Sequence, residues 1–103
     1  MEELINEVKR LVAELGLKVR AAVIVGSAAR GEAQPWSDID LLLISEDFEG
    51  LGSAERVKKV LEAWRGSRPI DPVCLTPSET LEDKPLLWEF CRDGKVVVDD
   101  GSF

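Results

Sequence analysis

The first half of the chain changes from a helical to a strand period. Residues 2–15 carry one apolar stripe, closed by Gly16: Leu4, Ile5, Val8, Leu11, Val12 and Leu15. Residues 17–25 alternate as a strand does, and their second face changes from charged to apolar along the strand. We therefore expect a strand that starts at an exposed edge, ends buried on both faces, and leads through Gly26-Ser27 into a short helix over residues 28–32.

The second half repeats this alternation of strand and helix. Residues 38–44 are apolar on both faces beyond Asp40, which predicts a central strand followed by a loop over residues 46–52. Ser53 is placed to cap a helix that ends at Gly66 and has an apolar stripe: Val57, Val60, Leu61 and Trp64.

Four further elements are predicted after Gly66. Residues 70–75 form a third strand, and Thr76-Pro77-Ser78-Glu79 has the form of a capping box that starts a helical turn. A helix over residues 86–92 and a last strand over residues 95–99 follow. The order α-β-α-β-α-β-α-β, without repeats or linkers, predicts one α/β domain over residues 1–103.

Composition fits this picture of one soluble domain. The chain has 103 residues, of which 45% are hydrophobic and 32% are charged. No apolar run approaches the roughly 20 residues of a membrane-spanning helix. Its acidic start is unlike a secretory signal, so we expect a cytoplasmic protein without membrane contact.

Charge and missing residue types narrow the chemistry. A net charge of −7 argues against nucleic acid as a partner, although metal ions would allow a small polyphosphate to bind. The chain contains no histidine, which excludes Ser-His-Asp catalysis, histidine-ligated zinc and histidine bases. Cys74 and Cys91 form no C-x-x-C motif and are expected to be reduced core thiols.

Asp38 and Asp40 form the first candidate site. Residues two apart on a strand project to the same face, so the two carboxylates lie close together and repel unless a cation separates them. With oxygen ligands alone, that cation is Mg²⁺ or Mn²⁺. Asp-x-Asp is common, however, and by itself it favours two surface acids at a strand end.

Gly26-Ser27 supplies a second kind of group. A glycine between a buried strand and a helix lets the backbone approach a ligand, and the helix N-terminus offers N–H groups and a favourable dipole to phosphate. Alone, the pair reads as an ordinary turn with a serine cap. A phosphate-binding turn and an acid pair on consecutive strands together indicate a site for a nucleotide and metal.

These residues also carry a family resemblance. Gly26-Ser27, ten further residues and Asp38-x-Asp40, between two apolar strands, resemble the DNA-polymerase-β-type nucleotidyltransferases. The chain is most similar to the minimal nucleotidyltransferases, small antitoxins paired with a HEPN-domain toxin. The resemblance covers nearly the whole chain, and it implies a mixed sheet flanked by helices.

The resemblance assigns roles residue by residue. Gly26 and Ser27 match the turn that holds phosphate, and Asp38 and Asp40 match the acids that bind two Mg²⁺ ions. Asp71 is the candidate for the third catalytic acid and metal ligand, although Pro72 departs from the usual apolar residue after it. The alternative for Asp71 is a strand-end acid that faces water.

Arg30 matches a position that is commonly basic in the family. One turn into the helix after Gly26-Ser27, its side chain either reaches a triphosphate oxygen or faces solvent, and the sequence favours neither.

The resemblance further implies an activity and a partner. It implies the transfer of AMP from ATP to a hydroxyl, with a tyrosine of the HEPN toxin as the acceptor. This chain has no tyrosine, so modification of its own tyrosines is excluded. The rival acceptor, an RNA 3′-hydroxyl, is disfavoured by the negative charge.

The alternative function is an antitoxin without catalytic activity that neutralises its toxin by binding alone. On a helix, the apolar residues of segment 86–91 (Leu-Leu-Trp-Glu-Phe-Cys) spread over roughly 200°, broader than one core contact needs. One side is then available to a second chain, either a copy or a partner. The competing interpretation is a deeply buried helix.

Overall fold

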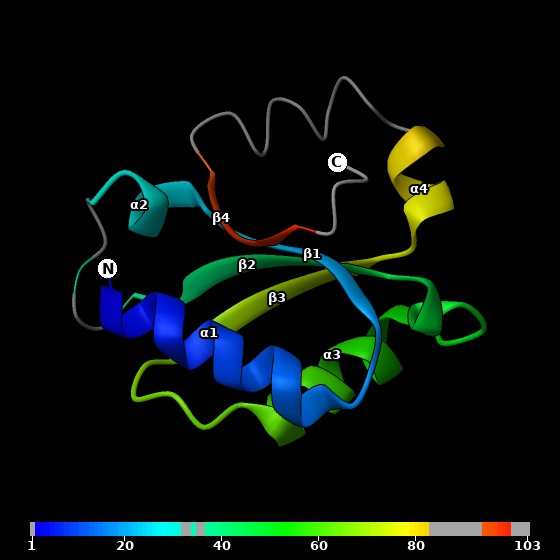
Figure 1. Ribbon diagram of the computed structural model, residues 1–103, viewed down its shortest axis with the longest axis horizontal. Helices are drawn as coiled ribbons and strands as arrows, with labels where there is room; N and C mark the ends of the chain where they lie inside the picture. The colour runs from blue at the N-terminus through cyan, green and yellow to red at the C-terminus, as the bar shows by residue number, and fades with distance from the viewer. Residues whose placement is uncertain (1, 32–33, 35–36, 83–93, 100–103) are drawn as a thin grey trace.

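The computed structural model describes residues 2–31, 34, 37–82 and 94–99 (Figure 1). Its helices are α1 (Glu2–Leu15), α2 (Gly26–Ala29), the 3-10 helix η1 (Glu46–Phe48), α3 (Ser53–Ala63) and α4 (Pro77–Glu82). Its strands are β1 (Val19–Val25), β2 (Ile39–Ser45), β3 (Ile70–Leu75) and β4 (Lys95–Asp99). The predicted helix over residues 86–92 and Cys91 lie outside the described residues.

The strands form one mixed sheet in the order β3-β2-β1-β4. β1 pairs antiparallel with β2 and with β4, whereas β2 and β3 run parallel. Helices α1 and α3 lie on the same side of the sheet, and α4 lies towards the other side (Figure 1). The prediction of a single α/β domain with a mixed sheet flanked by helices is therefore confirmed.

Apolar side chains fill both sides of the central strands. On the helix-covered side, buried residues of α1 and α3 form one cluster with alternate residues of the strands, such as Ile24, Leu41 and Leu43, which are all fully buried. A smaller cluster on the opposite side consists of Ala21, Val23, Val25, Leu42 and Ile44. β1 becomes buried on both faces along its length, as its sequence predicts.

Several element boundaries differ from the predicted ones; for example, β2 covers Ile39–Ser45 rather than residues 38–44, and α3 ends at Ala63 rather than at Gly66. β1 begins at Val19 rather than residue 17, because the Lys18 N–H donates to Oδ2 of Asp47 (2.7 Å) instead of entering the sheet. The short helix covers Gly26–Ala29 rather than residues 28–32. η1 occupies part of the predicted loop, and Ser45 starts it by accepting the Asp47 N–H through its hydroxyl (3.1 Å).

One predicted helix cap is confirmed and one is wrong. The Glu79 N–H donates to Thr76 Oγ1 (3.3 Å) and the Thr76 N–H donates to Glu79 Oε1 (2.7 Å), which completes the capping box of α4. Ser53 does not cap α3. The helix begins one residue earlier than a Ser53 cap requires, because the Arg56 N–H donates to the carbonyl of Gly52 (3.0 Å).

A buried arginine changes which face of α3 meets the core. Arg56 is only 8% exposed, whereas Leu61, predicted to be in the core, is 47% exposed. The Arg56 guanidinium donates to the carbonyls of Leu51 (2.9 Å) and Cys74 (3.1 Å) and to Glu79 (2.7 Å). These acceptors compensate the buried charge, so α3 turns Arg56 and Val60 towards the core and leaves Leu61 of the predicted apolar stripe exposed.

Arg56→Ala is expected to lower the free energy of unfolding by about 3 kcal/mol, because the buried carbonyl of Cys74 and the partly buried carbonyl of Leu51 lose their donor. The Arg56 hydrogen bond lowers the pKa of Glu79 below its ordinary value of 4.5. The stability from this pair is therefore complete above pH 4.5 and is lost as the pH falls through the lowered pKa. Urea unfolding at several pH values measures this loss.

The control is Arg65→Ala, because the Arg65 side chain is 63% exposed and lies 3.9 Å from Glu14. Two results would contradict a stabilising contribution of the Arg56–Glu79 pair. One is an equal loss of stability in the two variants, and the other is a loss in Arg56→Ala that does not become smaller in acid.

Two smaller expectations concern the cysteine and the membrane. Cys74 is a free, buried thiol as predicted, and burial raises its pKa to about 11, so the thiol stays protonated. Across the described ranges, no helix has the length and apolar character that crossing a membrane requires.

Candidate functional site

The predicted acids gather where three strand ends meet. β1 ends at Val25, and β2 and β3 both begin at the same edge of the sheet because β2 runs antiparallel to β1 and parallel to β3. Asp40 is the register partner of Val25 on one side and of Asp71 on the other. The sheet thus brings together Asp40 and Asp71, which are 31 positions apart in the sequence.

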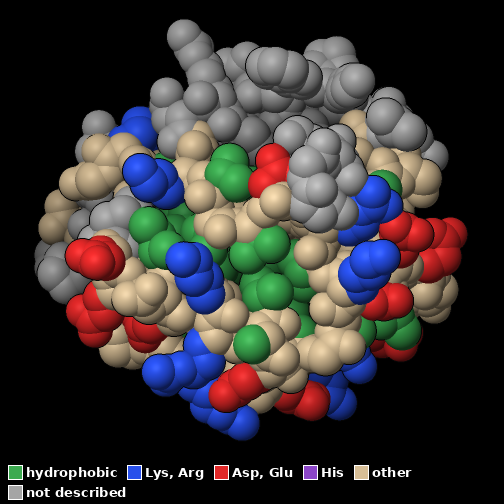
Figure 2. All heavy atoms as spheres, in the orientation of Figure 1, with side chains coloured by type: hydrophobic (Ala, Val, Ile, Leu, Met, Phe, Trp, Pro, Cys, Tyr) green, Lys and Arg blue, Asp and Glu red, His purple; other side chains and the backbone are tan. Residues whose placement is uncertain are grey.

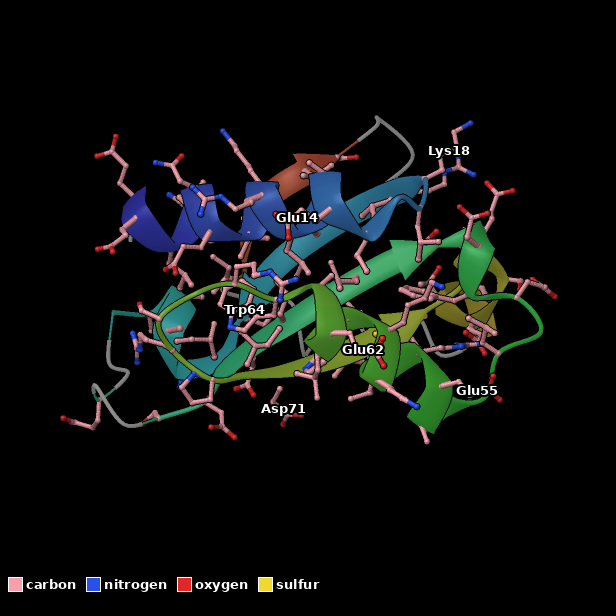
Figure 3. All side chains as sticks on the ribbon, turned by 90° about the horizontal axis from the view of Figure 1, so that it is seen from below. Glu14, Lys18, Glu55, Glu62, Trp64 and Asp71 are labelled. Atoms are coloured by element: carbon pink, nitrogen blue, oxygen red, sulfur yellow. The ribbon has the colours of Figure 1, made fainter. Side chains whose placement is uncertain are left out.

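Asp40 and Asp71 project to the side of the sheet that α1 and α3 leave uncovered. Their strands are parallel and in register, so the two side chains lie on the same face. The next residues of β2 on that face, Leu42 and Ile44, belong to the smaller apolar cluster. Asp38 directly precedes β2 and is exposed, and Asp71 lies near the start of β3 (Figure 3).

Gly26 lies directly against the carboxylate of Asp40. Its φ angle of +70° belongs to the left-handed region, which a glycine adopts without strain. A Cβ atom at this position would come within 3.0 Å of Oδ2 of Asp40, closer than Cβ atoms approach other groups. The turn after β1 and the acid on β2 therefore form one compact unit.

The carboxylate of Asp40 is affected by burial and by the two neighbouring acids. Burial raises the pKa of Asp40 above its ordinary value of 3.8, and the charges of Asp71 and Asp38 raise it further. Asp71 is exposed to solvent, as one interpretation of the sequence expected, and still acts on Asp40. The arrangement concentrates negative charge that a cation would relieve.

The donor atoms have the chemistry that Mg²⁺ prefers. Carboxylate oxygens are ligands for hard divalent cations, and Mg²⁺ in nucleotide sites commonly uses one or two carboxylates together with substrate phosphates. Within residues 2–31, 34, 37–82 and 94–99, no three acidic, thiol or imidazole side chains form a preassembled metal site. The acid set therefore suits a metal ion that arrives with a polyphosphate.

The turn after β1 differs from its prediction in one respect. α2 contains only four residues, so it has a single turn of aligned peptide dipoles and the expected dipole effect on phosphate is small. Backbone N–H groups remain the donors that this turn offers. Ser27 is the second residue of α2, and its side chain lies outside the described part. Arg30 ends α2 and is exposed.

Sequence reasoning missed a contact beside the acids. The Ile39 N–H donates to the carbonyl of Pro69 (2.9 Å), which joins the chain just before β3 to the start of β2. No periodicity or motif signals this bond, because it depends on which strands become neighbours.

The sequence matches the family model described as a nucleotidyltransferase domain over residues 1–85. The chain therefore belongs to the nucleotidyltransferase domain family, the class that the turn and the acid pair indicate. No protein with a curated description matches the sequence.

Solved structures show the same fold. A protein from Sulfolobus solfataricus that is taken to be a nucleotidyltransferase is 22% identical, with a TM-score of 0.60 over 92% of this chain and 76% of that chain. A toxin–antitoxin structure with AMP-PNP is 16% identical, with a TM-score of 0.62 over 94% of this chain and 74% of that chain. A toxin–antitoxin MntA-HpeT mutant with two Asp-to-Glu substitutions is 14% identical, with a TM-score of 0.61 and the same coverage.

Proposed function

We propose that this protein transfers AMP from ATP to a hydroxyl group, with Asp38, Asp40 and Asp71 as its catalytic acids and metal ligands. The observation that carries the proposal is the register pair of Asp40 and Asp71 beside the Gly26 turn. This arrangement places a backbone turn suited to phosphate next to carboxylates suited to a divalent cation.

Each residue has a part in the proposed reaction. Backbone N–H groups of Gly26 and Ser27 hold the phosphates, while Asp38 and Asp40 bind the metal ions. The Asp71 carboxylate orients the acceptor hydroxyl and takes its proton. The acceptor oxygen forms a bond to the α-phosphorus, the bond from that phosphorus to the bridging oxygen breaks, and pyrophosphate leaves. Bound Mg²⁺, for which Mn²⁺ can substitute, supplies positive charge that stabilises the transferring phosphate.

The proposed acceptor is a tyrosine of a HEPN-domain toxin, whose modification would silence it, so this protein would act as the antitoxin. Two of the similar structures are toxin–antitoxin pairs, and one of them carries AMP-PNP. A net charge of −7 would attract a basic, RNA-binding toxin and repel free RNA. On the face shown in Figure 2, however, acidic and basic side chains are interleaved, so the attraction comes from total charge rather than from one acidic patch there.

The test incubates the protein with ATP, Mg²⁺ and a candidate HEPN toxin and then measures the mass of the toxin. We expect the toxin to gain one or more AMP units on tyrosine, and Asp38→Asn to abolish the gain. The control is Glu49→Gln, which removes an exposed carboxylate that lies beyond the far end of β2.

Two results would overturn this proposal. Label on RNA ends with an unmodified toxin would identify the rival acceptor. Neutralisation of the toxin that survives the double substitution of Asp38 and Asp40 by Asn would favour the antitoxin that acts by binding alone.

A further inference from the structure

The loop between α3 and β3, residues 64–69, is held in place by two side chains. Nε1 of Trp64 donates to the carbonyl of Arg68 (2.7 Å), and the Ser67 N–H donates to Oε2 of Glu7 on α1 (2.7 Å). Trp64 lies inside the curve of this loop (Figure 3), and its ring occupies the space that a side chain at Gly66 would need. The backbone at Arg68 is therefore fixed to the domain core.

From this anchored position, the Arg68 side chain reaches Gln34, which precedes the acid pair in the sequence. Its Nη2 donates to the carbonyl of Gln34 (2.5 Å). The same carbonyl accepts the N–H of Ser37 (3.0 Å), the residue directly before Asp38. Arg68 thus connects the approach to β3 with the approach to β2.

A second bond lies next to this one. Pro69 follows Arg68, and its carbonyl accepts the Ile39 N–H (2.9 Å). Ile39 lies between Asp38 and Asp40, and Asp71 comes two residues after Pro69. The two bonds therefore fasten the backbone on both sides of the acid set, where β2 and β3 begin.

The partial burial of the Arg68 side chain argues for a specific task. Its Nε is buried and has no hydrogen-bond partner within the part of the chain that the structure describes. Burying an N–H without an acceptor is unfavourable and offsets the stability that the other hydrogen bonds of the guanidinium contribute. Stability alone therefore does not explain an arginine at this position. Its described side-chain hydrogen bond is the one that Nη2 makes to the carbonyl of Gln34.

We propose that Arg68 is a positioning residue, which sets the distance between the Asp38–Asp40 pair and Asp71 by bonding the Gln34 carbonyl. Its effect on catalysis rests on the proposed function. Its effect on the backbone at the start of β2 and β3 does not depend on that function. The bond acts through backbone, so loss of the guanidinium should loosen the acids without removing any group that touches the nucleotide.

The first measurement is hydrogen exchange of the Ile39 amide in the full chain, without nucleotide. We expect Arg68→Gln to speed this exchange at least tenfold, while the amides of Ala22 and Leu43 in the sheet centre keep their rates. The control is Arg65→Gln, because Arg65 is exposed and bonds only the Glu62 carbonyl (3.2 Å) and Glu14 among the described contacts. An unchanged Ile39 rate in Arg68→Gln would overturn the proposal.

The second measurement is steady-state transfer of AMP. We expect Arg68→Gln to lower kcat about 10- to 100-fold and to change the KM for ATP less than threefold, because misplaced acids slow the chemical step. Arg68→Lys should recover most of the rate, since one donor to Gln34 suffices. A raised KM for ATP with unchanged kcat would make Arg68 a phosphate ligand and would overturn the positioning role.

The two measurements separate two kinds of failure. If the wild-type protein transfers no AMP, the proposed function fails, and the exchange of the Ile39 amide still decides whether Arg68 fixes the strand starts. If transfer occurs and Arg68→Gln matches Arg65→Gln in both rate and exchange, only the role of Arg68 is wrong.

Discussion

Asp40→Asn is expected to lower the rate of AMP transfer by about 10³-fold or more and, at neutral pH, to stabilise the protein. The loss of activity follows from the removal of a charged metal ligand next to the reacting phosphate. The gain in stability follows from the raised pKa of Asp40, because its ionised form is disfavoured by burial and by the charges of Asp71 and Asp38. An amide of the same shape relieves both effects and should raise the free energy of unfolding at pH 7.

The sign of this effect depends on pH. A carboxyl whose pKa is raised in the folded state costs no stability below its ordinary pKa of 3.8, where both states are protonated. The cost appears as the pH rises through the raised pKa and then remains. The advantage of Asp40→Asn should therefore be small in acid and complete at pH 7, and urea unfolding across this range measures it.

The matched control is Glu49→Gln, which also removes one negative charge but lies on the exposed loop after η1. If both variants stabilise the protein equally, the gain comes from the smaller total negative charge. Local repulsion at Asp40 is then not its cause. Added Mg²⁺ should narrow the difference between the wild-type protein and Asp40→Asn, because the ion relieves the same repulsion.

Local patterns in the sequence predicted local structure well. The capping box at Thr76 forms because the residues that satisfy one another are three apart in the chain. The acid pair and the turn at Gly26 could be located because each lies directly at the end of a strand that the hydrophobic pattern predicts. Ser53 failed as a cap because the Gly52 carbonyl, one residue earlier, already accepts the first helical bond.

Contacts that depend on strand neighbours could not be predicted from these patterns. A periodic stripe treats every arginine as exposed, and only the tertiary acceptors at Cys74 and Glu79 allow Arg56 to be buried. The approach of Gly26 to Asp40 requires the antiparallel register of β1 with β2, which spacing along the chain does not reveal. The bond from Arg68 to Gln34 spans 34 positions and has no sequence signal.

Gly26→Ala is expected to lower the rate of AMP transfer by about 10²-fold, a loss that its effect on stability does not explain. The new methyl group would overlap Oδ2 of Asp40, and the carboxylate can escape only by rotating away from the turn. A displacement of about 1 Å in a catalytic group is enough for a loss of this size. Because only the end of a side chain must move, the collision itself should cost about 1 kcal/mol of stability.

Gly16→Ala provides the matched control for this variant. Gly16 has a φ angle of +68°, close to the +70° of Gly26, but a Cβ placed there meets no atom of another described part of the chain within 4 Å. Both variants carry the same backbone strain of about 1 kcal/mol, so their difference isolates the contact with Asp40. We expect Gly16→Ala to keep wild-type kcat and KM, with unfolding measured in urea for both proteins.

A double-mutant cycle then tests whether Asp40 is the group that the methyl displaces. In an Asp40→Ala background, where the carboxylate is gone, Gly26→Ala should cost no more stability than Gly16→Ala does. If Gly26→Ala remains as costly there as in the wild-type protein, the methyl collides with another group. If Gly26→Ala and Gly16→Ala have equal activity, the close approach of the turn to Asp40 is not what the transfer of AMP requires.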